Sequence, residues 1–338
     1  MHGIFTVILA VALILAALEA GMRFLVCHPD HLRRMSRKLQ NSIGYLYIQG
    51  ERKVMPFLKE CSRYSPDFGY TLKPGRFVFT EREFSNTYHI NSLGVRASEE
   101  ALDGPQVVIL GDSFAFGWGV DQDEIFSSLL EKRTNLKFLN TAVPSFGTVR
   151  EMIMLRSIDR SRLRCIILQY CGDDYDENIR YYRNGNRPQI MRKQTFHRLV
   201  RLHSRPRRYF FGKYLWMKIK KKTNEFMAKR KKTGQPPPMD ETDMFLYVLK
   251  QNRDILDGIP IVMFEMNGVR QENRITSLLA KRAAHESQPE FIRNMRILDL
   301  SGVLKDEHYY VLDGHMTPEG HRILADTIYD ALCDMGII

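Results

Sequence analysis

Four consecutive apolar residues, Val107 to Leu110, run directly into Gly111, Asp112 and Ser113. An apolar run of this length suits a central parallel strand that is covered on both faces. Gly111 permits a tight turn, Asp112 and Ser113 are favoured at helix N-termini, and a helical pattern begins a few residues further on. The stretch therefore predicts a strand that delivers the Ser113 hydroxyl to the carboxyl edge of a parallel sheet. Taken alone, the same residues also fit a serine that only caps a helix.

A second polar cluster lies near the other end of the chain, where Asp313 and His315 precede Pro318 and a helical pattern. A serine hydroxyl is a weak nucleophile until a base takes its proton, and the base needs a carboxylate to orient it. Ser113 is thus the candidate nucleophile, His315 the base and Asp313 the orienting acid. If the carboxylate cannot reach Nδ1, a backbone carbonyl must orient the ring. His321 is interpreted as a helix residue that packs near the site.

With the blocks between them, these motifs resemble the SGNH (GDSL-type) hydrolase superfamily, and the flanking sequence resembles its membrane-anchored members. The resemblance covers most of residues 66–335, interrupted by one long basic segment. The blocks that carry it are Gly69-Tyr70, Lys73-Pro74-Gly75, Ile90 to Arg96, and Gly111 to Val120. It implies an acyl-ester hydrolase that acts through an acyl-enzyme, with Ser113, His315 and Asp313 as the catalytic residues. The single residue between Asp313 and His315 departs from the commoner Asp-x-x-His.

The resemblance also implies an oxyanion hole made by the backbone N–H of Ser113, a loop glycine and an asparagine. At the glycine position this chain has Ser145, whose backbone donor is expected to survive if φ is negative. Gly147 is a second candidate, and a plain strand-to-helix turn is the alternative for this loop. At the asparagine position stands Asp173, which cannot donate a hydrogen bond when ionised.

Three outcomes are open for Asp173. Its surroundings hold it protonated, or it points away and leaves two backbone donors, or the site is weakened or repurposed. Losing one oxyanion donor typically costs on the order of 10²–10³ in rate. The acidic residues from Asp173 to Glu177 lack the spacing of a cation site, so neither a metal nor a cofactor is expected.

Strand and helix patterns alternate after residue 100, which predicts an α/β fold with a parallel five-stranded sheet and helices on both faces. The resemblance implies a flavodoxin-like three-layer sandwich with strand order 2-1-3-4-5. The predicted strands are Val107–Leu110, Phe138–Ala142, Cys165–Tyr170, Ile259–Glu265 and Arg296–Leu300. The predicted helices are Asp123–Arg133, Thr148–Ser157, Asp243–Leu256, Glu272–His285 and Pro318–Met335.

Residues 3–18 carry no charge, and residues 1–26 are predicted to form a single-pass transmembrane helix. Glu19 must then lie near an interface, and it can pair with Arg23 on the same helix face. A cleaved signal peptide is the alternative, but it would have positive charge before the apolar core. Basic residues that follow the span favour a cytoplasmic catalytic domain, whereas the resemblance points to envelope material outside, so the side stays open.

The rest of the chain is expected to comprise a basic juxtamembrane segment (27–65), a small β-rich appendage (66–100) and the hydrolase-like domain (101–338). Asn91, Gly94 and Arg96 are interpreted as supporting the fold, with a direct role in the site as the alternative. The five cysteines are too scattered for a disulfide framework, and Cys165 and Cys171 are expected to be small core residues.

A basic insertion spans about residues 180–240 and interleaves aromatic with Lys and Arg residues. Residues 208–222 are predicted to form a basic amphipathic helix on an anionic membrane surface, with a solvated lid and nucleic-acid binding as alternatives. The basic residues include Arg205, Arg207, Arg208, Lys220, Lys221, Lys222, Lys229, Arg230, Lys231 and Lys232. Gln235 to Pro238 is expected to end the insertion as a stiff linker. The net charge of +11 agrees with an acidic partner or surface.

Two further functions remain open. An O-acyltransferase that modifies a carbohydrate would use the same acyl-enzyme, because exclusion of water and binding of an acceptor decide between the two reactions. A catalytically weak, membrane-bound binding or assembly protein would explain the departures at Ser145 and Asp173.

Overall fold

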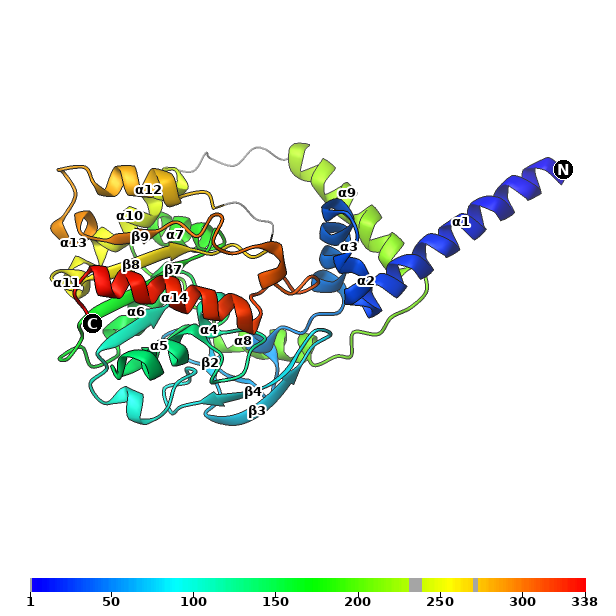
Figure 1. The fold of residues 1–338 in the computed structure, drawn as a ribbon. Helices are drawn as coiled ribbons and strands as arrows, with labels where there is room; N and C mark the ends of the chain where they lie inside the picture. The colour runs from blue at the N-terminus through cyan, green and yellow to red at the C-terminus, as the bar shows by residue number, and fades with distance from the viewer. Residues whose placement is uncertain (1, 231–238, 270–272) are drawn as a thin grey trace.

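The computed structural model describes residues 2–230, 239–269 and 273–338. At its centre lies a five-stranded sheet in the order β6-β5-β7-β8-β9, with every neighbouring pair parallel (Figure 1). The strands are β5 (Val107–Leu110), β6 (Phe138–Asn140), β7 (Cys165–Tyr170), β8 (Ile261–Glu265) and β9 (Arg296–Leu298). The predicted α/β class and five-stranded parallel sheet are therefore confirmed.

Helices follow most of these strands. They are α4 (Ser113–Phe116), α5 (Phe126–Thr134), α6 (Thr148–Arg156), α7 (Asp174–Arg183), α10 (Glu241–Gln251), α11 (Arg253–Leu256), α12 (Thr276–Ala283), α13 (Glu290–Arg293) and α14 (Pro318–Asp334). Two differences from the predictions stand out. The helix after β5 begins at Ser113 itself rather than a few residues later. The helix predicted over 243–256 is broken at Asn252, whose side chain donates to the Val248 carbonyl and competes with the helical backbone. Glu272 lies outside the described residues.

The central strand is buried on both faces, as its lack of polar residues requires. Val107 and Ile109 belong to one hydrophobic cluster, which also holds residues of α5 and α14. Val108 and Leu110 belong to a second cluster, with residues of α6, α10 and α12. Successive side chains of a strand point to opposite faces, so β5 joins the two clusters at the level of the site.

A β-hairpin of β3 (Gly75–Thr80) and β4 (Ser85–Ile90) lies within residues 66–100, beside a short pair of β1 (Ser62–Arg63) and β2 (Thr71–Leu72). The hairpin packs against the loop after α4, where the rings of Phe79 and Trp118 have centroids 5.0 Å apart.

The same loop is fixed by Arg96, whose side chain is fully buried. Its guanidinium donates to the carbonyls of Gly117 and Val120 at 2.5 and 2.7 Å and lies over the Tyr88 ring. Arg96 therefore supports the fold and takes no direct part in the site.

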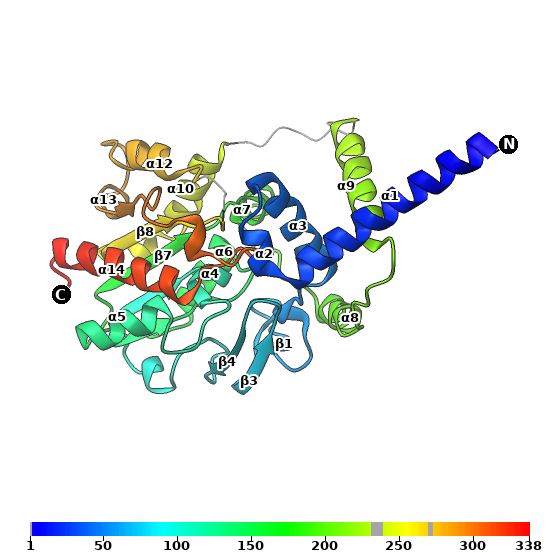
Figure 2. The ribbon, with the colours of Figure 1, turned by 45° about the vertical axis from the view of Figure 1, so that its right-hand side comes forward.

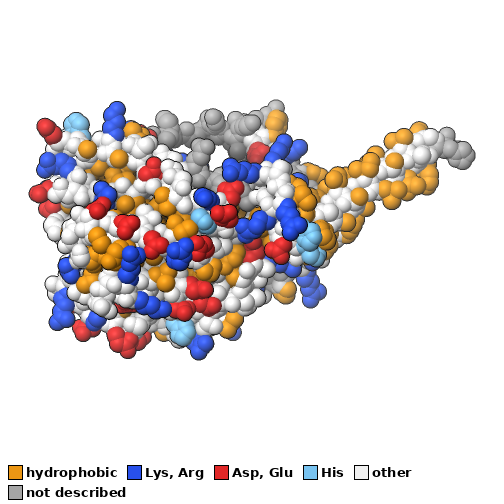
Figure 3. All heavy atoms as spheres, viewed as in Figure 1, with side chains coloured by type: hydrophobic (Ala, Val, Ile, Leu, Met, Phe, Trp, Pro, Cys, Tyr) orange, Lys and Arg blue, Asp and Glu red, His pale blue; other side chains and the backbone are white. Residues whose placement is uncertain are grey.

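The chain begins with α1 (His2–Cys27), which projects from the rest of the molecule (Figure 1). The segment Gly3–Cys27 is long and apolar enough to cross a membrane by length and composition, which a signal sequence would also satisfy. Figure 3 shows hydrophobic side chains along α1, with Lys and Arg side chains gathered near its base.

The predicted pairing of Glu19 with Arg23 is wrong. The buried Glu19 carboxylate accepts hydrogen bonds from the backbone N–H groups of Tyr214 and Leu215, at 3.1 and 3.0 Å. Arg23 instead donates to Glu51 at 2.7 Å. The N–H groups in the first turn of a helix have no partner within the helix, and they attract a carboxylate. At Glu19 they compete successfully with the Arg23 guanidinium four residues along α1.

Two helices follow α1, namely α2 (Pro29–Arg33) and α3 (Arg37–Gly50). Residues of α1, α2 and α3 share one hydrophobic cluster with Val311 and Leu312, just before Asp313. A Cβ at Gly44 of α3 would lie 3.3 Å from the Leu312 carbonyl oxygen, so the glycine allows a close approach. The juxtamembrane helices therefore contact the loop that carries the acid and the imidazole.

The basic insertion holds α8 (Lys193–His203) and α9 (Lys213–Arg230). The helix predicted over 208–222 therefore begins five residues later and continues to Arg230. Its first turn packs on α1 through Glu19, which sets where it starts. Lys231, Lys232 and the predicted linker over Gln235 to Pro238 lie outside the described residues.

Candidate active site

Ser113 is presented by a tight turn between β5 and α4. Gly111 has a φ of 154°, and a Cβ there would lie 2.5 Å from Oε1 of Gln169. That same Oε1 accepts from the backbone N–H of Asp112 at 2.9 Å. The Asp112 carboxylate accepts from the backbone N–H of Phe114 at 2.9 Å and so caps α4. The serine is therefore held at the first position of the helix, at the carboxyl end of a buried strand.

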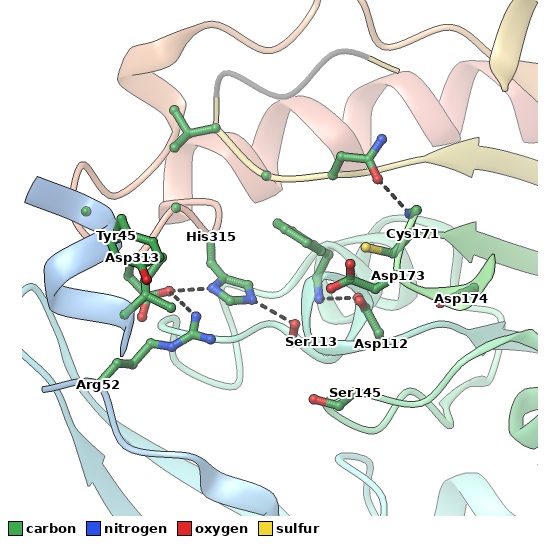
Figure 4. Close-up of a pocket in the computed structure, with 18 of the residues that line it drawn as sticks. Tyr45, Arg52, Asp112, Ser113, Ser145, Cys171, Asp173, Asp174, Asp313 and His315 are labelled. Atoms are coloured by element: carbon green, nitrogen blue, oxygen red, sulfur yellow. Dashed lines mark hydrogen bonds and ion pairs between the residues drawn. The ribbon is translucent and has the colours of Figure 1, made fainter. Parts of the chain in front are cut away.

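The structure brings Ser113, His315 and Asp313 into one hydrogen-bonded chain (Figure 4). His315 Nε2 lies 2.7 Å from Ser113 Oγ, and His315 Nδ1 contacts Asp313 Oδ1. The single intervening residue, Gly314, has a φ of 84°, which glycine adopts without strain. This left-handed turn brings the carboxylate to the ring, so no backbone carbonyl is needed to orient the imidazole.

The acid and the imidazole are enclosed by aromatic side chains. Asp313 is 3% exposed and His315 is 6% exposed. The His315 ring lies between those of Phe114 and Trp118, at centroid distances of 4.6 and 5.3 Å. Trp118 Nε1 also donates to Asp313 Oδ2 at 3.3 Å. Both oxygens of the carboxylate are therefore occupied, which fixes the rotamer that orients the ring.

Asp313 stays ionised in this enclosed position. Burial alone would raise the pKa of its carboxyl, but attraction by His315 and Arg52 and the hydrogen bonds from His315 and Trp118 hold it below its usual value. Arg52 Nη1 lies 3.9 Å from Asp313 Oδ1. Arg52 follows α3, so a residue of the predicted juxtamembrane segment contributes charge to the site.

Glu83, in the turn of the β3–β4 hairpin, holds the loop that carries Asp313. Its carboxylate accepts from the backbone N–H groups of Val311, Leu312 and Asp313 at 2.8, 2.9 and 2.9 Å. Burial raises the pKa of Glu83 to about 7, although these hydrogen bonds oppose the rise. Nothing in the sequence around Glu83 points to this role, because its partners lie at the other end of the chain.

Ser145 occupies a left-handed backbone conformation, with a φ of 65°. The condition of a negative φ is therefore not met, and the serine adopts a conformation that costs an L-residue roughly 1–2 kcal/mol. The loop is braced on both sides. The Pro144 carbonyl accepts from the Tyr70 hydroxyl at 2.8 Å, and the Ser145 carbonyl accepts from Arg150 Nη2.

Ser113 and Ser145 both line the pocket, and each carries a backbone N–H. Among the described residues, neither N–H has a hydrogen-bond partner. Gly147 also lines the pocket, and it caps α6 with a φ of −116°. Two backbone donors are therefore available beside the serine hydroxyl.

Asp173 is exposed on the wall of the same pocket, immediately before α7. In Figure 4 it lies between Ser113 and Asp174, beside Asp112. Burial raises the pKa of Asp112 to about 6, and the charge of Asp173 adds to the rise. The Asp173 side chain does not cap α7. It stands on the pocket wall as a carboxylate where the resemblance implies an amide.

Two more acids are buried behind this wall. Burial raises the pKa values of Asp174 and Glu151 well above their usual range, and the charge of Asp112 raises both further. Thr148 Oγ1 donates to Asp174 at 3.0 Å. Neither oxygen of Glu151 has a partner among the described residues. Buried acids and the cations Arg150, Arg180 and Arg274 therefore lie together around this part of the pocket.

The pocket around Ser113 has a volume of about 600 Å³, and α3 forms part of its wall. Within the described ranges, no three His, Cys, Asp or Glu residues are arranged to hold a metal ion. All five cysteines are free thiols, and Cys165 and Cys171 are buried as expected. His321 lies in α14 and stacks on Phe126, and burial lowers its pKa to about 3.

The comparisons with known proteins add little to this geometry. No family model matches the chain, and no curated protein matches it. Twenty chains of solved structures match. One of them is 13% identical, covers 69% of this chain and 98% of its own length, and superposes with a TM-score of 0.35.

Proposed function

We propose that this chain is a serine-dependent acyl-ester hydrolase of the SGNH type, on a flavodoxin-like three-layer fold with strand order 2-1-3-4-5. The observation that carries the proposal is the chain of contacts from Ser113 Oγ through His315 to Asp313, with 2.7 Å between Oγ and Nε2. A hydroxyl, an imidazole and a carboxylate in this order form the usual means of activating a serine.

In the proposed reaction, Ser113 Oγ attacks the ester carbonyl carbon while His315 Nε2 takes the hydroxyl proton. Asp313 keeps the Nδ1 proton in place and stabilises the imidazolium that forms. The tetrahedral intermediate then collapses, and the departing alcohol receives the proton from Nε2. Water attacks the acyl-enzyme by the same route, which releases the carboxylic acid and restores Ser113.

Charge on the substrate oxygen would be stabilised by the backbone N–H groups of Ser113 and Ser145. Both belong to residues that line the pocket, and neither has a partner among the described residues. Asp173 stands where a third donor is expected from the resemblance. An ionised carboxylate there opposes the oxyanion, so Asp173 would lower the rate unless it binds a proton or turns away.

We further propose that α1 anchors the enzyme in a membrane and that the basic insertion lies against its anionic surface. The apolar length of Gly3–Cys27 supports the anchor. The Lys and Arg residues of α9 and of the loop before it support the surface contact.

Labelling with a fluorophosphonate probe tests the catalytic proposal, because the probe reacts only with an activated serine. The full-length protein in detergent should be labelled, and Ser113→Ala should not. Ser161→Ala, at an exposed serine outside the pocket, is the matched control and should label like the wild type. Absence of labelling in folded wild-type protein would contradict the proposal.

A second candidate is a membrane-bound binding protein with weak or no catalysis, and the position of Asp173 on the pocket wall favours it. Asp173→Asn separates the two candidates. A protein whose only defect is this carboxylate should gain labelling in the variant. A binding protein should stay unlabelled in both forms.

A further inference from the structure

The exposed part of α1 indicates where a membrane surface would meet the molecule. The side chains of Ile4, Phe5 and most later residues to Leu18 are largely exposed, whereas Glu19 is fully buried. Sixteen residues of helix span about 24 Å, close to the roughly 30 Å hydrocarbon core of a bilayer. The surface would therefore lie near Glu19, where α9 begins. This step rests on the membrane anchor proposed above.

Two opposite faces of α9 have different surroundings. Tyr214 and Lys213 are buried on one face, and α9 packs there against α1 and α3. Trp216, Ile219 and Phe226 are each more than half exposed on the other face. In Figures 1 and 2, α9 crosses α1 near the catalytic domain instead of running along it. An apolar stripe on a lysine-rich helix in this position is typical of a helix that lies in a membrane interface.

A groove of about 620 Å³ runs between α3 and α9, from the apolar stripe toward the catalytic pocket. Trp216 and Phe210 contribute to its lining, with four cations, Arg207, Arg208, Lys213 and Lys220. Tyr45 and Gln49 of α3 line both this groove and the pocket that holds Ser113. The groove therefore joins the proposed membrane level to the mouth of the catalytic pocket.

The four cations of the groove interact with acidic side chains only at a distance, since Glu51 and Glu19 attract Lys213 and Glu81 attracts Arg207. Among the described residues, none of them forms an ion pair with a carboxylate. Lys213 is only 8% exposed, and its Nζ donates to the carbonyls of Gly50 and Arg208 at 2.9 and 3.4 Å. Burial lowers the pKa of Lys213, and repulsion by Arg207 adds to this, although attraction by Glu51 opposes it. Bringing cations together costs free energy, and a bound anion would offset that cost.

We propose that the groove between α3 and α9 binds the net-anionic phosphate headgroup of a membrane lipid. Arginine forks and lysine ammonium groups suit phosphate oxygens. Trp216 and Phe210 would contact the glycerol and upper acyl region, where aromatic residues favour the membrane interface. A headgroup in this position would border the catalytic pocket through Tyr45 and Gln49.

Tryptophan quenching by brominated lipids tests the proposal without requiring catalysis. The chain has two tryptophans, and Trp118 is buried. The part of the quenching that disappears in Trp216→Phe therefore reports on the groove. Full-length protein is reconstituted with brominated phosphatidylglycerol or brominated phosphatidylcholine. Wild-type protein should bind the anionic lipid at Trp216 at least about 25-fold more tightly, since each cation contributes about a factor of five and at least two act together.

Two double variants with the same change in charge locate the effect. Arg207→Gln with Lys220→Gln removes two exposed cations of the groove and should reduce the preference by a factor of about 25. Lys218→Gln with Lys222→Gln removes lysines of α9 outside the groove and should leave most of the preference.

Three results would overturn the headgroup site. They are equal quenching of the wild type by both lipids, equal loss of preference in both double variants, and quenching by neither lipid. The third would also overturn the position of α9 at the membrane. Fluorophosphonate labelling is independent of all three, so the catalytic proposal stands or fails separately.

Discussion

Ser113 lies between two sides of one pocket that differ in how their charges are balanced. On the side of His315, Asp313 accepts from the imidazole with one oxygen and from Trp118 with the other, while its backbone N–H is bound by Glu83. The side-chain oxygens of Asp313 and both ring nitrogens of His315 have partners, and the Asp313 carboxyl keeps a pKa below its usual value.

On the opposite side, four acids lie close together, and Arg150, which lines the same pocket, pairs with Glu177 and not with any of them. They are Asp112, Asp173, Asp174 and Glu151. Burial raises the pKa of three of them, and Asp173 stands at the pocket wall. For the proposed hydrolase, activation of Ser113 and stabilisation of an oxyanion are therefore separable properties, and the geometry suits the first better than the second.

The largest effect is expected on the side of the pocket that holds Asp313 and His315. In Asp313→Asn the ring can take the wrong tautomer, so kcat for an activated acetate ester should fall on the order of 10⁴-fold while the fold is kept. Steady-state kinetics on the full-length protein in detergent measure this. Asp330→Asn, an exposed position of α14, controls for the loss of one negative charge. A change of less than tenfold in Asp313→Asn would mean that the acid does not orient His315.

At the other side, Asp173→Asn should raise the rate. The substitution removes a negative charge beside the developing oxyanion and supplies an amide donor, so kcat should rise by up to about 10²–10³-fold. Asp176→Asn, in the same helical turn but outside the pocket lining, is the matched control. An unchanged or lower kcat in Asp173→Asn would show that this carboxylate does not limit the reaction.

The charge imbalance should also appear as a pH dependence of stability. Asp112 has a folded pKa of about 6 against an ordinary value of 3.8, so the native state binds more protons between these pH values. Stability contributed by this group is present below about pH 4 and is lost as the pH rises through about 6. The loss is on the order of 3 kcal/mol.

Asp112→Asn tests this dependence because asparagine also caps a helix but carries no charge. Denaturant unfolding at a series of pH values should show the variant gaining stability relative to wild type as the pH rises from 4 to 7. A difference between the two proteins that does not change with pH would contradict the buried, repelled carboxylate.

The positions of Ser113, Asp313 and His315 could be predicted from the sequence better than the rest of the pocket. An apolar strand followed by Gly111, Asp112 and Ser113, and an acid two residues before His315, are local patterns with a direct chemical reading. Glu83 and Arg52 were missed because they reach the site through tertiary contacts from distant segments. No spacing rule connects residues that meet only when the hairpin and α3 pack on the catalytic loop.

Local rules also failed where tertiary contacts offered a stronger partner. Glu19 and Arg23 have the spacing of a helical ion pair, yet the first turn of α9 takes Glu19 and Glu51 takes Arg23. The sign of φ at Ser145 was likewise decided by its surroundings, through the bracing from Tyr70 and Arg150. The sequence predicted the strands, the helices and the residues Ser113, His315 and Asp313. Tertiary packing determined the side-chain partners and backbone angles.

The smallest effect is expected at Ser145, where it tests that bracing. Ser145→Gly removes the strain of a left-handed L-residue but adds freedom to the unfolded chain, so the free energy of unfolding should rise by no more than about 1 kcal/mol. The backbone N–H is unchanged, so labelling of Ser113 should persist. At Ser204, where φ is −72°, the same substitution should instead destabilise. If both glycine variants are destabilised equally, the loop at Ser145 stores no strain. If Ser145→Gly loses labelling, the loop needs more than a backbone donor at this position.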